Sequence, residues 1–153
     1  MSDMDPTEFE AAKQASTFQL LFRCARLVNE LSLARVRERY GVPGLRAAHT
    51  ALFPHLDMEG VRLTELARRV GVSKQAVGQL VDDLERMGAL HRVPDPSDGR
   101  AKLIQFKGRW LLDGIGVLME VERELVEEAG AAEIAGLRAG LIAVLAAVEG
   151  ETG

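Results

Sequence analysis

The amino-acid sequence predicts a mostly α-helical protein with one small β-hairpin. Ala and Leu favour helices, and aromatic residues make up only 5% of the chain, so Leu, Val and Ala must fill most of the core. Few segments show the two-residue alternation that is typical of strands. Within residues 64–102, a helical pattern, a short turn, a Ser-initiated helix and a polar hairpin follow one another, which is the order of a winged helix-turn-helix.

Composition and charge restrict the class of protein. The 153 residues are 47% hydrophobic, which is enough for one sizeable core, and the formal net charge is -4. An acidic total argues against a protein that coats nucleic acid without specificity. The basic residues are nevertheless concentrated in the 64–102 segment, which predicts a locally basic face. They are Arg68, Arg69, Lys74, Arg92, Arg100 and Lys102.

The sequence predicts a soluble cytoplasmic protein without a disulfide. It contains a single cysteine, Cys24, no run of 18 or more apolar residues, and an acidic start without the layout of a signal peptide. We expect Cys24 to be buried as a small hydrophobic residue, with redox sensing as the alternative.

The N-terminal part predicts two helices. Apolar residues lie on two faces of a long helix over residues 7–40, so we expect it to be buried both by its own core and by a partner subunit. Gly41-Val-Pro-Gly44 ends this helix. A second helix is expected over residues 45–56, with Pro54 shortening its end.

The next segment predicts the helix-turn-helix. Residues 57–60 form a turn and residues 61–63 a minimal strand. Thr64 is expected to cap the first helix, which Gly71 ends, and Ser73 to cap the second. Gly88 is a candidate for the C-terminal cap of that second helix, before strands over residues 89–93 and 101–106. The inward positions of the second helix are expected to be Ala76, Val77, Leu80, Val81, Leu84 and Met87.

The C-terminal part predicts two further helices, over residues 108–128 and 132–148, separated by Gly130. Their two-heptad length is too short for an independent coiled coil, so a bundle with the N-terminal helix is expected. We therefore expect one domain over residues 1–153. Residues 7–44 and 108–150 would form a helical dimerisation region, and residues 45–107 the winged helix-turn-helix lobe.

The outward face of the Ser73 helix predicts contact with a DNA groove. Its first turns carry Lys74, Gln75 and Gln79, whereas carboxylates come later. This order suits a helix whose positive dipole end meets DNA, with Gln for adenine edges and Lys for guanine edges or phosphate. Gly78 is unexpected there, because glycine inside a helix costs about 1 kcal/mol relative to alanine. It either allows close approach to the groove or is simply tolerated.

Four stretches together resemble the MarR family of winged-helix transcriptional regulators. They are Leu63–Ser73, Val81–Leu90, Arg92 and Asp95–Arg100, and the order of helices around them also matches over nearly the whole chain. The Asp98-x-Arg100 pair in the wing is the most diagnostic element. Two departures are Gly78, where the family usually has Thr or Ser, and the compressed Gln105–Arg109, which lacks a hydroxyl residue.

The resemblance implies a homodimer that reads a pseudopalindromic site in double-stranded DNA, with Arg100 in the minor groove and Asp98 holding the hairpin. We expect a repressor, and the residues themselves do not separate this from an activator. The expected DNA-binding residues are Thr64, Arg68, Arg69, Ser73, Lys74, Gln75, Gln79, Arg92, Asp98, Arg100 and Lys102. The alternatives are a winged-helix protein-interaction module that has lost DNA binding, and a thiol-based regulator that uses Cys24.

The resemblance also implies a small aromatic or lipophilic effector, bound in a cleft beside the DNA-binding lobe. Leu20, His49, Phe53 and Trp110 are the residues expected to line it. The residues do not identify the effector.

No enzymatic constellation is present in the sequence. The three histidines and one cysteine lack metal-ligand spacing, and no phosphate-binding glycine motif or nucleophile elbow occurs. Carboxylates between residues 120 and 128 alternate along a helix and predict a solvated face. We therefore expect no enzyme activity, no cofactor, no metal and no membrane partner.

Overall fold

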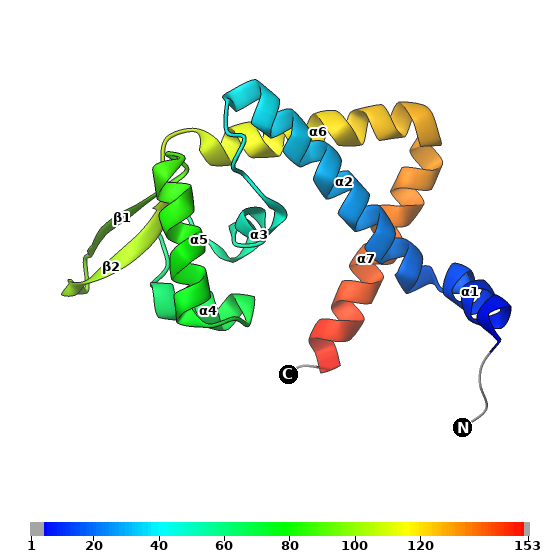
Figure 1. Ribbon diagram of the computed structural model, residues 1–153, viewed down its shortest axis with the longest axis horizontal. Coiled ribbons are helices and arrows are strands. Elements are labelled where there is room, and N and C mark those ends of the chain that lie inside the picture. The colour runs from blue at the N-terminus through cyan, green and yellow to red at the C-terminus, as the bar shows by residue number, and fades with distance from the viewer. Residues whose placement is uncertain (1–4, 152–153) are drawn as a thin grey trace. The chain divides into compact units, whose positions relative to one another are not determined.

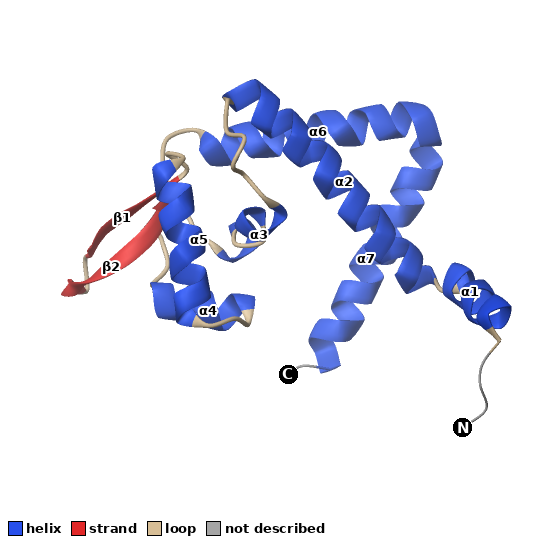
Figure 2. Cartoon of the chain, viewed as in Figure 1, coloured by secondary structure: helices blue, strands red, loops and turns tan. Residues whose placement is uncertain are grey.

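The computed structural model describes residues 5–151 and is mostly helical, with one antiparallel β-hairpin (Figure 2). This confirms the fold class predicted from the sequence. The chain divides into two compact units, Met1–Gly114 and Ile115–Gly153. The first unit contains the winged helix-turn-helix.

The N-terminal segment forms two helices instead of the single one predicted, α1 (Pro6–Ala15) and α2 (Thr17–Tyr40). Ser16 interrupts them with an extended backbone, φ -78° and ψ 117°, and its hydroxyl accepts a hydrogen bond from the backbone N–H of Gln19 at 3.4 Å. A serine that caps a new helix satisfies a backbone donor that the break would otherwise leave unpaired. Gly41 ends α2 in the left-handed conformation, with φ +63°.

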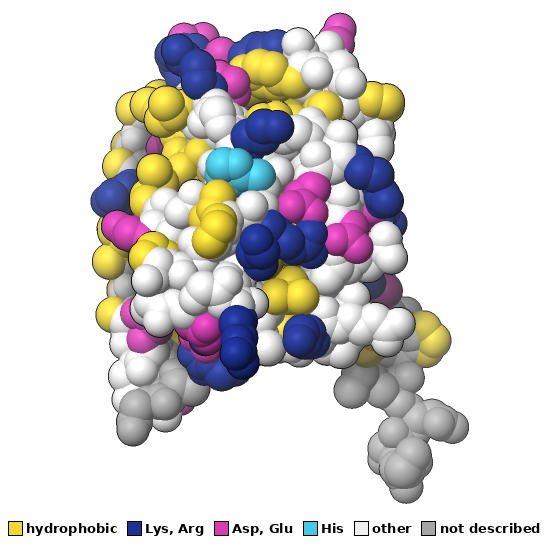
Figure 3. All heavy atoms as spheres, turned by 90° about the vertical axis from the view of Figure 1, so that its left-hand side faces the viewer, with side chains coloured by type: hydrophobic (Ala, Val, Ile, Leu, Met, Phe, Trp, Pro, Cys, Tyr) yellow, Lys and Arg dark blue, Asp and Glu magenta, His cyan; other side chains and the backbone are white. Residues whose placement is uncertain are grey.

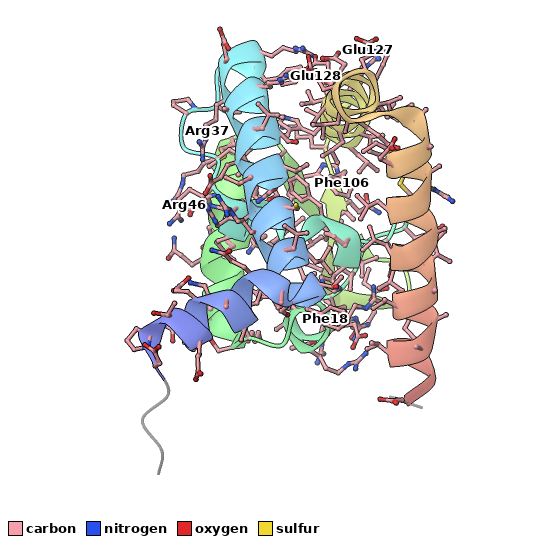
Figure 4. All side chains as sticks on the ribbon, turned by 90° about the vertical axis from the view of Figure 1, so that its right-hand side faces the viewer. Phe18, Arg37, Arg46, Phe106, Glu127 and Glu128 are labelled. Carbon is pink, nitrogen blue, oxygen red and sulfur yellow. The ribbon has the colours of Figure 1, made fainter. Side chains whose placement is uncertain are left out.

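The second predicted helix is shorter than expected. It consists of α3 (Ala47–Thr50) and a 3-10 turn, η1 (Phe53–His55). Pro54 has no backbone N–H to continue the helical ladder, which explains the early end. Leu45 and Leu52 are nevertheless buried on either side of α3. Arg37 of α2, which is labelled in Figure 4, donates from Nε to the Leu45 carbonyl oxygen at 2.6 Å. This bond links the end of α2 to the start of the lobe.

The helix-turn-helix is formed by α4 (Leu63–Val70) and α5 (Lys74–Arg86). The wing follows as β1 (Leu90–Asp95) and β2 (Asp98–Phe106), beside α5 in the ribbon (Figure 1). The strands pair from Leu90↔Phe106 to Pro94↔Lys102, and the register shifts before Asp95↔Asp98. Gly71 and Gly88 have positive φ, as expected of residues that end helices. The buried apolar side chains of this lobe are Leu45, Leu52, Val61, Leu66, Ala67, Val77, Val81, Leu84, Ala89, Leu90 and Ile104.

Residues 60 and 61 lie along the second strand of the wing. Val61 forms an isolated antiparallel bridge with Ile104, so only one residue of the predicted strand 61–63 pairs. Gly60 has φ +96°, and a Cβ there would lie 2.7 Å from Cγ of Gln105. Glycine is therefore required at this position by both backbone conformation and space.

The second unit is built from helices. Helix α6 (Trp110–Ala129) begins in the first unit and runs into the second, and α7 (Ala131–Glu151) follows after Gly130. No residue of α7 is buried, although most of its residues are apolar. By length and composition α7 also meets the requirement for a membrane-spanning helix, a test that core helices of soluble proteins pass as well.

Candidate nucleic-acid interface

Helix α5 presents its polar N-terminal half to solvent. The hydroxyl of Ser73 accepts from the backbone N–H of Ala76 at 3.1 Å, which confirms the predicted cap. Val77, Val81 and Leu84 are buried and fix the rotation of the helix about its axis. Lys74, Gln75 and Gln79 consequently lie on the exposed side. Ala76 is exposed too, contrary to the prediction that it packs inward, because it lies one position before the buried stripe.

Gly78 does not serve helix packing. A Cβ at this position would meet only Cδ2 of Leu63, at 3.8 Å, which is an ordinary van der Waals distance. Its backbone has no positive φ either. The first unit therefore has room for a side chain at position 78, and its own packing supplies no reason for glycine.

Helix α4 begins earlier than predicted. Its N-cap is Arg62, whose side chain makes no capping hydrogen bond, so Thr64 is an exposed residue of the first turn and not the cap. Helix starts of this kind leave backbone N–H groups for solvent or for a ligand. The hydroxyl of Thr64 is available on the same end of the helix.

Two of the predicted DNA-binding arginines are engaged by carboxylates of the same lobe. Arg68 donates to Glu65 at 2.7 and 2.9 Å, and Arg69 to Glu65 at 3.0 Å and to Asp57 at 2.8 Å. The hydrogen bonds from Arg68, and then those from Arg69, hold the pKa of Glu65 at about 2. These arginines therefore contribute less positive potential than the sequence alone indicates.

Arg92 of β1 is also paired. Its guanidinium lies 3.0 Å from Asp82 and forms a second ion pair with Glu85, both on α5. This contact ties the first strand of the wing to the C-terminal half of α5. Arg92 was predicted as a DNA contact, and the structure places it against protein carboxylates.

The wing carries Arg100 and Lys102, two of the three remaining cations of the predicted site, and α5 carries the third, Lys74. The side-chain oxygen Oδ1 of Asp98 accepts from the backbone N–H of Arg100 at 3.1 Å, so Asp98 shapes the tip of the hairpin. Among residues 5–151, no ion-pair or hydrogen-bond partner is found for the charged groups of Lys74, Arg100 and Lys102. The side of the molecule that carries the wing shows Lys and Arg interleaved with Asp and Glu, without a continuous basic surface (Figure 3).

A buried histidine supports α5 from behind. His49 of α3 is 1% exposed, and its Nε2 lies 3.1 Å from Oδ2 of Asp83. Its Nδ1 accepts the backbone N–H of Arg46 at 2.9 Å, so the proton of the neutral ring is on Nε2 and is donated to Asp83. The hydrogen bond from His49 is the largest cause of a lowered pKa of Asp83. A shallow pocket of about 350 Å³ adjoins this contact, lined by Gly44, Arg46, His49, Asp83, Arg86 and Met87.

The other residues predicted to line a ligand cleft are dispersed over the first unit. Phe53 packs edge to face against Phe106, with ring centroids 5.4 Å apart. Leu20 is 60% exposed on α2, and Trp110 is half-buried at the start of α6. The 350 Å³ pocket contains only His49 of the four. Cys24 is exposed on α2, contrary to the prediction that it is buried.

Two arginines make contacts that the sequence does not predict. Arg62 reaches the wing residues Asp95 and Asp98, and Arg46 lies 3.4 Å from Asp83. The partners are 33 and 37 residues apart in the chain, so no local spacing pattern relates them. The sequence feature that could have identified Arg62 is its position directly before the first helix of the helix-turn-helix.

Comparison with known structures places this architecture among winged helix-turn-helix proteins. A probable transcriptional regulator from Pseudomonas aeruginosa is 25% identical with a TM-score of 0.56, covering 86% of this chain and 98% of its own. CouR from Rhodococcus jostii RHA1, bound to p-coumaroyl-CoA, is 24% identical with a TM-score of 0.61, covering 86% and 92%. MepR of Staphylococcus aureus in complex with DNA is 19% identical with a TM-score of 0.57, covering 84% and 98%.

The sequence of the lobe also matches a known family. Residues 40–101 match the MarR family, over the segment that contains α3, α4, α5 and most of the wing. No curated protein matches the chain. The winged helix-turn-helix of this chain is therefore similar to the MarR family over residues 40–101, in agreement with the resemblance stated from its motifs.

Proposed function

We propose that this chain is a sequence-specific DNA-binding transcriptional regulator that acts as a homodimer on a pseudopalindromic operator. The observation that carries the proposal is the exposed polar N-terminal half of α5 beside a wing with two cations, Arg100 and Lys102, for which residues 5–151 provide no ion-pair partner. A helix N-terminus attracts phosphate, and the first turns of such a helix reach base edges in the major groove. The proposal is supported by the similarity to MepR, whose structure was solved in complex with DNA.

Each side chain of the interface has a role in this proposal. Gln75 and Gln79 suit adenine edges, and Lys74 suits guanine or phosphate. Arg100 enters the minor groove, where a narrow A·T segment has enhanced negative potential. Ser73 and Thr64 stand at helix starts, where hydroxyls and backbone N–H groups bind phosphate.

The paired residues have a supporting role. Asp98 holds the tip of the wing, while Arg92 ties β1 to α5. Arg68 and Arg69 are already paired with Glu65. To contact a phosphate, each guanidinium must bind it in addition to this carboxylate or in place of it. Their contribution to DNA affinity is therefore smaller than that of Lys74, Arg100 and Lys102.

We further propose that residues 7–44 and 108–150 form the dimerisation region and residues 45–107 the DNA-binding lobe. Large apolar side chains are exposed on α2 and on α7, including Phe22 at 64%, Leu137 at 52% and Leu145 at 57%. Exposed apolar patches of this kind mark protein interfaces. Two lobes held by a dimer would read half-sites about one helical turn of DNA apart.

A small aromatic or lipophilic effector would regulate DNA binding by favouring one spacing of the two lobes. This part of the proposal is supported by CouR, whose structure contains p-coumaroyl-CoA. Leu20, His49, Phe53 and Trp110 remain the proposed lining residues. We propose that the protein is a cytoplasmic repressor without enzymatic activity.

Two other functions have an observation in their favour. Neutralisation of Arg68, Arg69 and Arg92 by carboxylates weakens the basic face and favours a protein-interaction module.

The exposure of Cys24 makes its thiol accessible to oxidants, which favours a thiol-based regulator. If peroxide releases the wild-type protein from DNA but does not release Cys24→Ser, a redox response is established.

The proposal is tested by binding of the purified protein to DNA. A duplex that spans the region upstream of its gene is compared with a random duplex of equal length and base composition in a mobility-shift competition. We expect the upstream duplex to be preferred. Equal or undetectable binding of the two duplexes would rule out the regulator and favour the protein-interaction module.

A further inference from the structure

Arg62 lies at the junction of the helix-turn-helix and the wing. It is the N-cap residue of α4, and the residue before it, Val61, is bridged to β2. The two backbone hydrogen bonds of that bridge join Val61 and Ile104 at 3.1 and 2.8 Å. The backbone of Arg62 is therefore fixed on one side by the wing and on the other by α4.

The guanidinium of Arg62 binds the wing and does not cap its own helix. Its Nη2 lies 2.6 Å and its Nε 2.8 Å from the same oxygen, Oδ2 of Asp95. Its Nη2 also lies 3.7 Å from Oδ2 of Asp98. One side chain thus contacts both ends of the turn that closes the hairpin.

Asp95 uses its second oxygen to shape the turn. Oδ1 accepts the backbone N–H of Ser97 at 2.8 Å and its hydroxyl at 2.7 Å. The Asp95 residue is only 7% exposed, so an unpaired carboxylate here would carry a desolvation penalty. Arg62 is the cation that compensates it.

Asp98 connects Arg62 to the tip of the wing. Its Oδ1 accepts the backbone N–H of Arg100 at 3.1 Å, while its Oδ2 faces Arg62. These contacts lie where the strand register shifts between Pro94 and Asp95, so regular strand pairing does not hold this part of the wing. Side-chain contacts have to replace it.

We propose that Arg62 is the positioning residue of the wing, which holds the Asp95–Asp98 turn in one conformation and thereby sets the position of Arg100. Its charge is occupied by two carboxylates, so it acts through Arg100 and not as a phosphate contact. The predicted effect of Arg62 on DNA binding rests on the proposed function, whereas its restraint of the Asp95–Asp98 turn does not.

The hold on the turn is tested without DNA, by amide hydrogen exchange in the full-length protein. In Arg62→Ala, the amides of Ser97 and Arg100 should exchange about ten-fold faster, because their acceptors lose a charged partner. Arg62→Lys should give an intermediate rate, since lysine restores the charge but not the two donors. Arg68→Ala, an arginine of α4 paired with Glu65, should leave these amides unchanged. Wild-type exchange at Ser97 and Arg100 in Arg62→Ala would overturn the proposal.

The effect on DNA is tested by a double-mutant cycle with Arg100 on the upstream duplex. Arg62→Ala should weaken binding about ten-fold in the wild-type chain and have almost no further effect in Arg100→Ala. An equal loss in both backgrounds would overturn positioning through Arg100. Should Arg62→Ala fail to fold, Arg62→Lys replaces it in both experiments. Absence of DNA binding by the wild-type chain would instead refute the proposed function, and the exchange rates would still decide whether Arg62 holds the turn.

Discussion

Individual basic residues of the lobe differ in whether their charge is already used. Arg68, Arg69 and Arg92 are neutralised by carboxylates of α4, α5 and the turn before α4. In the part of the chain that the structure describes, Lys74, Arg100 and Lys102 have no such partner. An exposed ion pair contributes under about 1 kcal/mol to stability, yet it lowers the positive potential offered to a phosphate. Counting basic residues in the sequence therefore overstates the basic face.

This difference predicts unequal effects of two arginine substitutions. Arg100→Ala should weaken DNA binding by about ten-fold or more, because it removes a guanidinium at the wing tip that no carboxylate among residues 5–151 neutralises. Arg68→Ala should have a smaller effect, since Glu65 already neutralises Arg68. Fluorescence anisotropy with a labelled upstream duplex measures both. If the two substitutions weaken DNA binding equally, ion pairing in the DNA-free lobe does not determine how much each arginine contributes to DNA affinity.

The carboxyl group of Asp95 predicts a dependence of stability on pH. Hydrogen bonds from the hydroxyl and backbone of Ser97, and then from Arg62, lower its pKa from 3.8 to about 2. A lowered pKa stabilises the fold at pH above the ordinary value, and this contribution is lost as the pH falls toward 2. The free energy of unfolding in urea should therefore decrease between about pH 4 and pH 2, and less steeply in Asp95→Asn. Parallel curves for the two proteins would contradict the assignment.

At the scale of elements, the sequence predicts which segments form helices better than it predicts where they end. The Ser73 cap and the Gly71 end are predicted correctly, because serine and glycine have distinct backbone roles there. The C-cap of α5 is Met87, one residue before the predicted Gly88, which follows it with a positive φ. The break at Ser16 was missed, since serine is also tolerated inside a helix. Thr64 is not the cap that the sequence predicts, because α4 starts at Leu63 with Arg62 as its N-cap.

Contacts between elements were the least predictable from the sequence. The pairings Arg62–Asp95 and His49–Asp83 join residues 33 and 34 positions apart, and they exist only because α4, the wing, α3 and α5 pack around one core. The candidate interface was predicted as a set of residues, whereas its internal ion pairs required the structure. The exposure of Cys24 also depends on how the elements pack, so it could not be predicted from the sequence either.

Two glycines of the lobe predict opposite effects of an added methyl group. Gly78→Ala should stabilise α5 by about 1 kcal/mol, because its Cβ meets only Leu63 at 3.8 Å. Gly60→Ala should destabilise the lobe, because its φ is +96° and its Cβ would lie 2.7 Å from Gln105. Urea unfolding of both variants measures the two effects. Destabilisation by Gly78→Ala would mean that position 78 has a packing role.

At the scale of the whole molecule, the exposed apolar side chains of α7 are the main feature that the single chain leaves unexplained. The proposed dimer predicts that Leu137→Glu shifts the protein toward monomer, because a carboxylate would replace a half-exposed leucine in the interface. Sedimentation equilibrium measures the shift. Lys74→Glu is the matched control, since it adds a carboxylate at an exposed position of α5 and should leave the dimer intact while weakening DNA binding.

The central claim is that this chain reads DNA through α5 and the wing, and the salt dependence of binding tests it most directly. Lys74, Arg100 and Lys102 on each of two chains would neutralise phosphates and release counterions. The logarithm of the association constant for the upstream duplex should therefore fall linearly with the logarithm of salt concentration, with a slope of about -5. A slope near zero, with no preference over random DNA at any salt concentration, would contradict it.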